Sequence, residues 1–203
     1  MKRLFVAFAI CCVCLLCGCS GVSAFNKLDE LTKQAGEIAL AENTQIAQMA
    51  KEWTTVENSM FETKYDKGLK NRTINLEVAS KTVDGLVLQP GEVFSFNKVV
   101  GLATKEKGYK EAKIFLKGEE VMGLGGGICQ LSSAIYNSAD QAGLEIVERH
   151  AHSMKVHYVP EGRDAATAYG GVDLKFKNTK KEPVRLRAQM DDGVLKTWME
   201  SSI

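Results

Sequence analysis

The chain begins with a basic pair followed by an unbroken apolar run. Lys2 and Arg3 precede residues 4–16, which carry only apolar side chains and cysteines, and small residues follow near position 18. A basic start, a short apolar core and a small-residue exit are typical of a secretory signal peptide. The run is shorter than the about 20 residues that a membrane-spanning helix needs. We therefore predict a lipoprotein signal peptide over residues 1–18, with an uncleaved membrane anchor as the alternative.

The next segment shows helical periodicity in a background of Ala, Glu, Gln, Lys and Leu. Apolar side chains recur near intervals of three and four between positions 25 and 67, at Leu28, Leu31, Ala35, Ile38, Ile46, Met49, Ala50 and Trp53. This spacing indicates amphipathic helix, and no proline interrupts it. The pattern predicts a helical spacer over residues 19–67, which joins the N-terminus to a folded domain over residues 68–203.

Short segments with different periods alternate through the rest of the chain. Residues 71–87 fit a helix or an extended segment, residues 90–91 form a Pro-Gly turn signal, and residues 93–96 read as a short strand. Near the C-terminus, apolar and polar positions alternate between turn signals, which predicts strands at 172–176, 184–190 and 194–198. The fold class predicted for the domain is α+β, with mainly antiparallel strands.

A glycine-rich loop precedes the clearest helical pattern of the domain. Residues 123–127 hold four glycines in five positions, and the side chains that can then share one helix face are Leu131, Ala134, Ile135, Ser138 and Ala142. Gly143 stands where a C-terminal cap is expected. The pattern predicts a glycine loop feeding a helix that starts at Cys129, followed by a strand at 144–147.

The predicted signal peptide changes the meaning of the six cysteines. Four of them lie inside it, at Cys11, Cys12, Cys14 and Cys17. Cys19 ends a Leu-Cys-Gly-Cys sequence that resembles a bacterial lipobox, in which the cysteine receives lipid. Cys129 would then be the one free thiol of the mature chain, which is unusual because oxidising compartments favour pairing. We expect an extracytoplasmic protein anchored to the membrane by lipid, whose Cys129 is either a reactive thiol or a buried structural residue.

Charge and ligand spacing exclude other classes of function. The 26 Lys and Arg side chains balance the 25 Asp and Glu side chains, and no basic block is present. We therefore expect no nucleic-acid partner. His150 and His152 lack the i, i+4 spacing of a helical zinc pair, and no second ligand motif accompanies them. We expect neither a metal nor another cofactor.

The position of Cys129 predicts a nucleophile. The N-terminus of a helix lowers the pKa of a thiol, because its unpaired N–H groups and its dipole favour negative charge. Glycines let the backbone approach a substrate closely, and N–H groups at Gly126 and Gly127 can stabilise an oxyanion. One loop would supply both functions.

A thiol nucleophile also needs a base and a group that orients the base. All three histidines follow Cys129 within 30 residues. If residues 150–158 are extended, His150 and His152 face one side and His157 faces the other. We predict His152 as the base, with His150 as the reserve and as a substrate contact.

Two more residues complete the predicted site. Asp164 is the expected orienter because it lies in the loop after the predicted strand, whereas Asp173 opens a new strand. Arg149 could bind a substrate carboxylate, or it could pair with Glu145 or Glu148.

Several segments together resemble the VanW-domain family. They occur in the family's order over roughly residues 71–187 and read PGEVFSFN at 90–97, Gly-Tyr at 108–109, GGGICQLSSAIY at 125–136, ERHAHS at 148–153 and PEGRDA at 160–165. Some VanW-domain proteins are L,D-transpeptidases of peptidoglycan that use the cysteine of this motif as the nucleophile. The resemblance implies the same activity here, with Cys129 in that role.

What the resemblance implies about substrates is equally specific. The donor would be a peptidoglycan stem peptide, the intermediate a thioester on Cys129, and the product a 3→3 cross-link. The alternatives are a non-catalytic lipoprotein that binds stem peptides or a glycopeptide, and a thiol peptidase of the cell wall.

Overall fold

The computed structural model describes residues 30–34, 52–116 and 118–202. The chain divides into two compact units, Met1–Lys51 and Glu52–Ile203. In the first unit, the described residues 30–34 are helical. Over the described residues, no helix has the length and apolarity that a membrane crossing requires. The fold below is that of the second unit alone.

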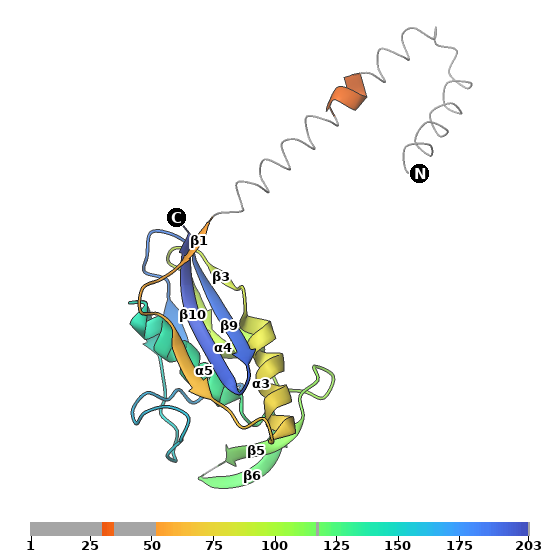
Figure 1. The fold of residues 1–203 in the computed structure, drawn as a ribbon, viewed down its shortest axis with the longest axis vertical. Helices are drawn as coiled ribbons and strands as arrows, with labels where there is room; N and C mark the ends of the chain where they lie inside the picture. Colours follow the sequence, from red (N-terminus) through yellow and green to blue (C-terminus); the bar gives the residue numbers. More distant parts are fainter. Residues whose placement is uncertain (1–29, 35–51, 117, 203) are drawn as a thin grey trace, which may run out of the picture. The chain divides into compact units, whose positions relative to one another are not determined.

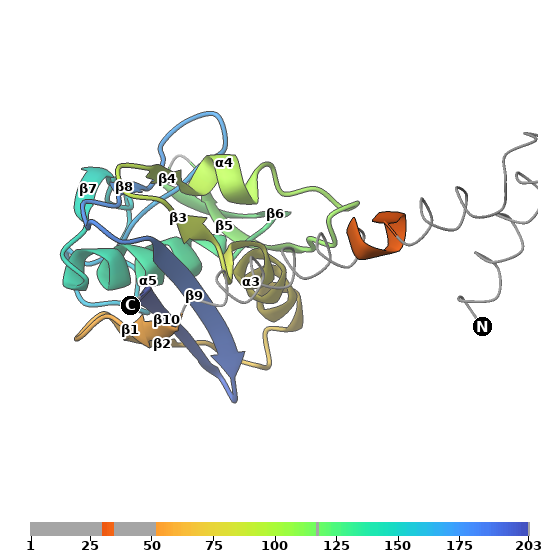
Figure 2. The same cartoon turned by 90° about the horizontal axis from the view of Figure 1, so that it is seen from above.

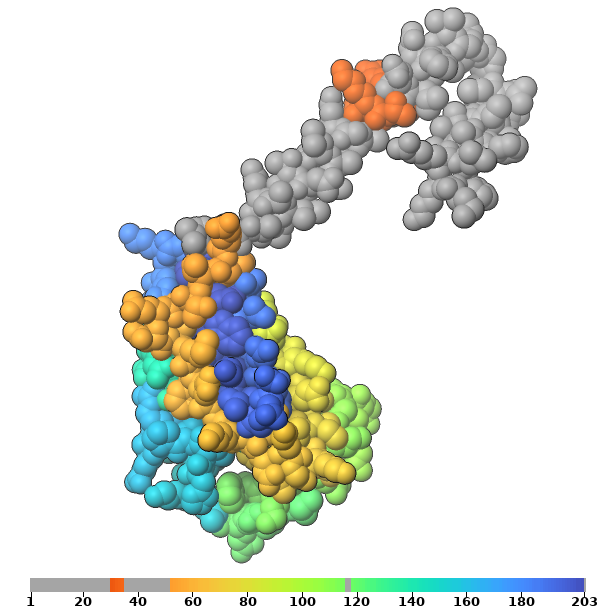
Figure 3. Space-filling view, viewed as in Figure 1, coloured from red at the N-terminus to blue at the C-terminus, as the bar shows by residue number. Residues whose placement is uncertain are grey.

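The second unit is built on a five-stranded antiparallel sheet (Figure 1). β9 (Val184–Asp191) and β10 (Val194–Ser202) form its long central hairpin. β1 (Trp53–Thr55) and β2 (Phe61–Lys64) pair with the other edge of β10, and β3 (Val87–Leu88) pairs with β9. Figure 3 shows the β2 segment, in orange, lying along the blue C-terminal hairpin.

Two smaller antiparallel sheets complete the strands. β4 (Val93–Ser95), β8 (Lys175–Lys177) and β7 (Glu145–Glu148) form one sheet, in which Phe94 stacks on its partner Phe176 at 4.7 Å between ring centroids. β5 (Glu111–Leu116) and β6 (Glu119–Leu124) form a separate hairpin. The antiparallel pairing and the intervening helices confirm the predicted α+β class.

The two longer helices of this unit, α3 (Lys70–Val83) and α5 (Ile128–Gln141), lie between the five-stranded sheet and the smaller sheets (Figure 2). α3 packs on β9, while α5 packs on β10 and also contacts β7; α4 (Phe96–Val100) is a short helix against α3. Burying apolar side chains from both faces of α5 joins the layers into one core. Its members include Leu76, Ala79, Phe94, Leu131, Ile135, Phe176, Leu186, Leu195 and Met199.

The predicted spacer is wrong over its last part. Residues 53–55 and 61–64 were expected to be helical, but they form β1 and β2, and the compact unit begins at 52 rather than 68. The reason is tertiary: these segments cover the edge of β10, whose backbone groups would otherwise be unpaired. Trp53 also lies against the Arg185 guanidinium, 4.3 Å from its ring centroid. The predicted signal peptide and the rest of the spacer, apart from residues 30–34, lie outside the described residues.

Most other elements lie where the pattern placed them. Residues 71–87, which fitted either conformation, form helix α3 over most of their length. The Pro-Gly turn at 90–91 is present, with Gly91 at φ 82°. Gly143 has a left-handed φ of 72° immediately after the end of α5, as a C-terminal cap requires. In the predicted strand at 172–176, pairing begins only at Lys175.

Candidate active site

The glycine loop places Cys129 in the first turn of α5, as predicted. Gly127 precedes the helix with φ 108°, a conformation that side chains rarely adopt. Gly126 is required by space, since a Cβ there would lie 2.4 Å from the carbonyl oxygen of Lys113. Glycine is therefore required at position 127 by the backbone conformation and at position 126 by the lack of space for a side chain.

Asn75 of α3 holds the loop in position. Its side chain is fully buried and donates to the carbonyl oxygens of Gly126 and Lys110, each at 3.0 Å, while it accepts the Lys110 N–H at 2.7 Å. Because a trans peptide directs its C=O and N–H to opposite sides, the bond to the Gly126 oxygen fixes the direction of the Gly127 N–H. Within the described part of the chain, the N–H groups of Gly126, Gly127 and Cys129 have no acceptor. The loop thus carries free donors beside the thiol.

The structure brings together the three residues predicted to act on the substrate. The Nδ1 of His152 lies 2.6 Å from Oδ2 of Asp164, which also accepts the backbone N–H of His152 at 2.7 Å. This leaves Nε2 as the nitrogen available toward Cys129 and the Tyr158 hydroxyl, the latter at 3.4 Å. The thiol itself donates to the carbonyl oxygen of Thr167 at 3.5 Å. Nucleophile, base and orienter therefore lie in the order that a thiol–imidazole–carboxylate site needs.

The ionisation of the group follows from these contacts. Burial alone would raise the pKa of Cys129, but the hydrogen bond with His152 and the His152 charge lower it below its ordinary value. Burial alone would lower the pKa of His152, but its bonds to Cys129 and Asp164 raise it above the ordinary value. Opposite shifts in the two partners favour a thiolate–imidazolium pair.

We expect the thiol to be acidic and its acidity to depend on His152. The rate of alkylation of Cys129 by iodoacetamide, followed on its own peptide by mass spectrometry, should have a pH midpoint below the reference value of about 8.5. The lowered pKa means that the reactive thiolate persists as the pH falls, until the pH passes the folded-state pKa. His152→Ala should move the midpoint upward, because burial then raises the thiol pKa and the opposing bond and charge of His152 are lost. A wild-type midpoint at or above the reference value would contradict this assignment.

The predicted strand over residues 150–158 is wrong. Apart from one bridge between His150 and Ala166, these residues form bends held by side chains. His150 therefore does not share the site with His152: it is exposed and pairs with Oε1 of Glu148 at 3.0 Å. His157 is exposed as well. His152 was selected because an extended segment would turn it toward the site. It does lie beside the thiol, but the segment is not extended.

Arg149 differs from both of its predicted roles. Its guanidinium bonds to Oδ1 of Asp164 at 2.9 Å and to the carbonyl oxygen of Gly162 at 2.9 Å. It supports the carboxylate behind His152 and does not line the cavity at Cys129. Asp173 binds the Ser95 hydroxyl and the Asn97 N–H, at the start of α4 and away from the thiol.

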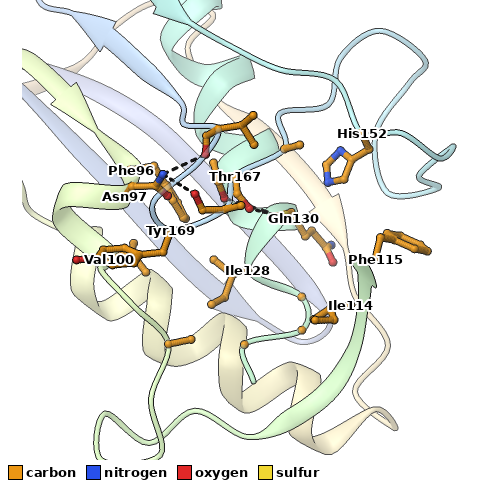
Figure 4. A pocket seen from close by; sticks show the side chains of 18 of the residues that line it. Phe96, Asn97, Val100, Ile114, Phe115, Ile128, Gln130, His152, Thr167 and Tyr169 are labelled. Atoms are coloured by element: carbon orange, nitrogen blue, oxygen red, sulfur yellow. Dashed lines mark hydrogen bonds between the residues drawn. The ribbon is translucent and has the colours of Figure 1, made fainter. Parts of the chain in front are cut away.

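A cavity of about 660 Å³ opens over the thiol and the glycine loop, a size typical of ligand pockets. Figure 4 shows His152 on one side of it and Val100 and Tyr169 on the other, with Ile128 between them. Its walls come from α3, the end of α4, the β5–β6 hairpin and residues 166–172. Among the described residues, no Asp or Glu side chain lines it, whereas two cations, Arg72 and Lys113, do.

Sequence reasoning missed four residues of the site. Thr167 contacts the thiol, Tyr158 contacts His152, and Gln130 and Arg72 bond to each other at 2.8 Å beneath the loop. Gln130 and Tyr158 lie in or next to segments already singled out, but nothing in their spacing assigns them to the site. Arg72 precedes the cysteine by 57 positions, and only the packing of α3 beside α5 brings it there.

Comparison with known proteins agrees with the resemblance seen in the motifs. The family model described as VanW like protein matches residues 71–199. The chain is 43% identical over 149 residues to "Uncharacterized protein YoaR" of Bacillus subtilis (strain 168), covering 73% of this chain and 49% of that protein. It is 33% identical over 128 residues to "Vancomycin B-type resistance protein VanW" of Enterococcus faecalis (strain ATCC 700802 / V583), covering 61% of this chain and 46% of that protein. The matches thus span about half the length of each relative, and no solved structure matches the chain. Since the family model covers more than half of the chain and includes Cys129, His152 and Asp164, the protein belongs to the VanW-like family.

Proposed function

We propose that this protein is a cysteine acyltransferase of the cell wall, an L,D-transpeptidase that forms 3→3 cross-links in peptidoglycan. The observation that carries the proposal is the contact of Cys129 with His152, and of His152 with Asp164, at the edge of an open cavity. The name of one relative refers to vancomycin resistance, which is consistent with a substrate in the cell wall.

The proposed reaction proceeds through a thioester. The Cys129 sulfur attacks the carbonyl carbon of the third residue of a stem tetrapeptide, and His152 takes the thiol proton. The bond to the terminal D-alanine breaks, and that residue leaves as an amine that receives the proton from His152. The side-chain amine of a second stem then attacks the thioester, giving a new amide and restoring the thiol. The free N–H groups at Gly127 and Cys129 are placed to stabilise the oxyanion in both steps.

A binding protein that holds stem peptides or a glycopeptide in the same cavity is the competing function. It needs the cavity but not an acidic thiol paired with an oriented imidazole. The shifted pKa values of Cys129 and His152 favour the enzyme, because such shifts cluster at catalytic sites.

The test is product analysis by mass spectrometry after incubation with disaccharide tetrapeptide. Cross-linking gives a dimer that has lost one D-alanine, and this result supports the transpeptidase. A tripeptide without dimer would replace it with a carboxypeptidase. Binding without any product would replace it with the binding protein.

We also propose that lipid on Cys19 holds the protein at the outer side of the cell membrane, close to this substrate. Cys19 lies outside the described residues, and the proposal rests on the lipobox-like sequence before it. Cys19→Ala should abolish incorporation of a fatty-acid probe and release the protein from the membrane fraction. Equal labelling of the wild type and Cys19→Ala would contradict the lipoprotein assignment.

A further inference from the structure

Arg72 is a partly buried cation beside the thiol without a carboxylate partner. One of its five N–H donors bonds to Oε1 of Gln130 at 2.8 Å, and the guanidinium carbon lies 5.9 Å from the ring centroid of Tyr158. Across the residues with described side chains, no Asp or Glu lies within ion-pair distance of it. Most of its hydrogen-bonding capacity is therefore unused by the protein.

The surroundings of Arg72 disfavour a positive charge in two ways. Burial lowers the pKa of the guanidinium. Arg72 also lies in the first turn of α3, where the helix dipole repels cations, and this turn contains Lys70 but no acidic residue. A desolvated charge is costly unless it is paired. The Cys129 thiolate favours this charge, but no Asp or Glu among the described residues pairs with it, so an anionic ligand is the partner that this placement calls for.

The cavity is suited to an anion at this point. In the part of the chain that the structure describes, no acidic side chain lines it, and Lys113, its other cation, is exposed and already paired with Glu120 at 2.7 Å. Arg72 packs directly under the glycine loop, so that a Cβ on Gly127 would lie 2.7 Å from its Cγ and 3.2 Å from one guanidinium nitrogen. The unpaired charge is thus next to the N–H groups that would hold the oxyanion.

We propose that Arg72 binds the terminal carboxylate of the acyl donor and restricts the enzyme to stems in which a single residue follows the scissile bond. This inference rests on the proposed function. One residue spans about 3.5 Å, and an ideal Cβ on Gly127 lies 3.2 Å from a guanidinium nitrogen, so the carboxylate of the residue after a carbonyl held over this loop can reach Arg72. A planar guanidinium can bind a carboxylate through two parallel hydrogen bonds. A donor whose terminus is an amide, or which continues by another residue, loses this contact.

The test uses the full chain carrying Cys129→Ala, so that binding is measured without turnover. Tetrapeptide donors ending in a carboxylate or in a carboxamide are titrated by calorimetry. The carboxylate form should bind about 10- to 100-fold more tightly, the range expected for losing one charged hydrogen-bonding partner. Arg72→Gln in the same background should lower carboxylate binding to the carboxamide level, and Arg72→Lys should restore part of the difference. Lys70→Gln is the matched control, because it removes a charge from the same helical turn outside the cavity, and it should retain the preference.

The outcomes separate this inference from the proposed function. Equal binding of the two donors by Cys129→Ala overturns the role of Arg72, even if the wild type forms cross-links. A carboxylate preference that depends on Arg72, without any turnover by the wild type, supports the anion site and overturns the transpeptidase. Circular dichroism of each variant shows whether it is folded. If Arg72→Gln does not fold, the comparison between the Cys129→Ala protein with and without Arg72→Lys decides, and an unchanged preference overturns the assignment.

Discussion

Cys129→Ser should abolish cross-linking and thioester formation while leaving the fold intact. Loss of a catalytic nucleophile or its base in such sites typically costs about 10⁴-fold or more in rate. Serine has nearly the same shape, and its hydroxyl can still donate to the carbonyl oxygen of Thr167, as the thiol does. It nevertheless has no stable anionic form near neutral pH, so the His152 pairing that lowers the thiol pKa cannot activate it equally. We expect the free energy of unfolding to change by no more than about 1 kcal/mol.

Intact-mass spectrometry measures this directly. The wild type incubated with donor should gain the mass of the stem peptide minus D-alanine, and Cys129→Ser should not. Ser132 and Ser133 are the neighbouring hydroxyls that could substitute, but both donate to backbone carbonyl oxygens, of Cys129 and Ala165. Turnover at the wild-type rate in a folded Cys129→Ser protein would therefore contradict the thiol as the nucleophile.

The part of the site that could be predicted is the part determined locally. A left-handed residue before a helix calls for glycine, and the 3.6-residue period of 131–142 marks the helix that follows, so Cys129 could be placed at its start without tertiary information. Strand parity then singled out His152, and a position in the loop after the predicted strand singled out Asp164. Their contact depends on a loop whose shape comes from Asp164 bonding the His152 backbone and from Arg149 bonding Asp164. Strand periodicity has no bearing on such a loop, which is why the argument about His150 does not hold.

The part that could not be predicted depends on partners distant in sequence. Trp53 to Thr55 have no intrinsic pattern that separates them from the helical segment before them, and they become a strand by pairing with residues 200–202. Arg72 likewise enters the site because α3 and α5 pack together. No sequence pattern near residues 53–55 or near Arg72 reveals these positions, because the residues they pack against lie more than 50 positions away.

His152→Ala should reduce turnover by about 10²- to 10⁴-fold, the usual contribution of a general base. In the proposed mechanism this residue accepts the thiol proton, and its removal leaves the partly buried thiol with a higher pKa, so the loss should be larger at neutral pH than at high pH. Asp164→Asn should lie between His152→Ala and the wild type, since an amide oxygen can still accept the His152 N–H but cannot stabilise an imidazolium by charge.

The other two histidines provide matched controls in the same loop. His150 and His157 are both exposed and neither lines the cavity, so His150→Ala and His157→Ala should each keep most of the turnover. Thermal melts of every variant separate loss of chemistry from loss of folding, which matters because His152 is held by two bonds to Asp164. A folded His152→Ala protein with wild-type turnover would show that the thiol is activated by another group. Tyr158 is the nearest candidate, but burial raises its pKa, so its phenol stays protonated at neutral pH and cannot accept the thiol proton. The imidazole that Asp164 orients is therefore the base that we propose, and the pH dependence of the His152→Ala defect is the measurement that decides it.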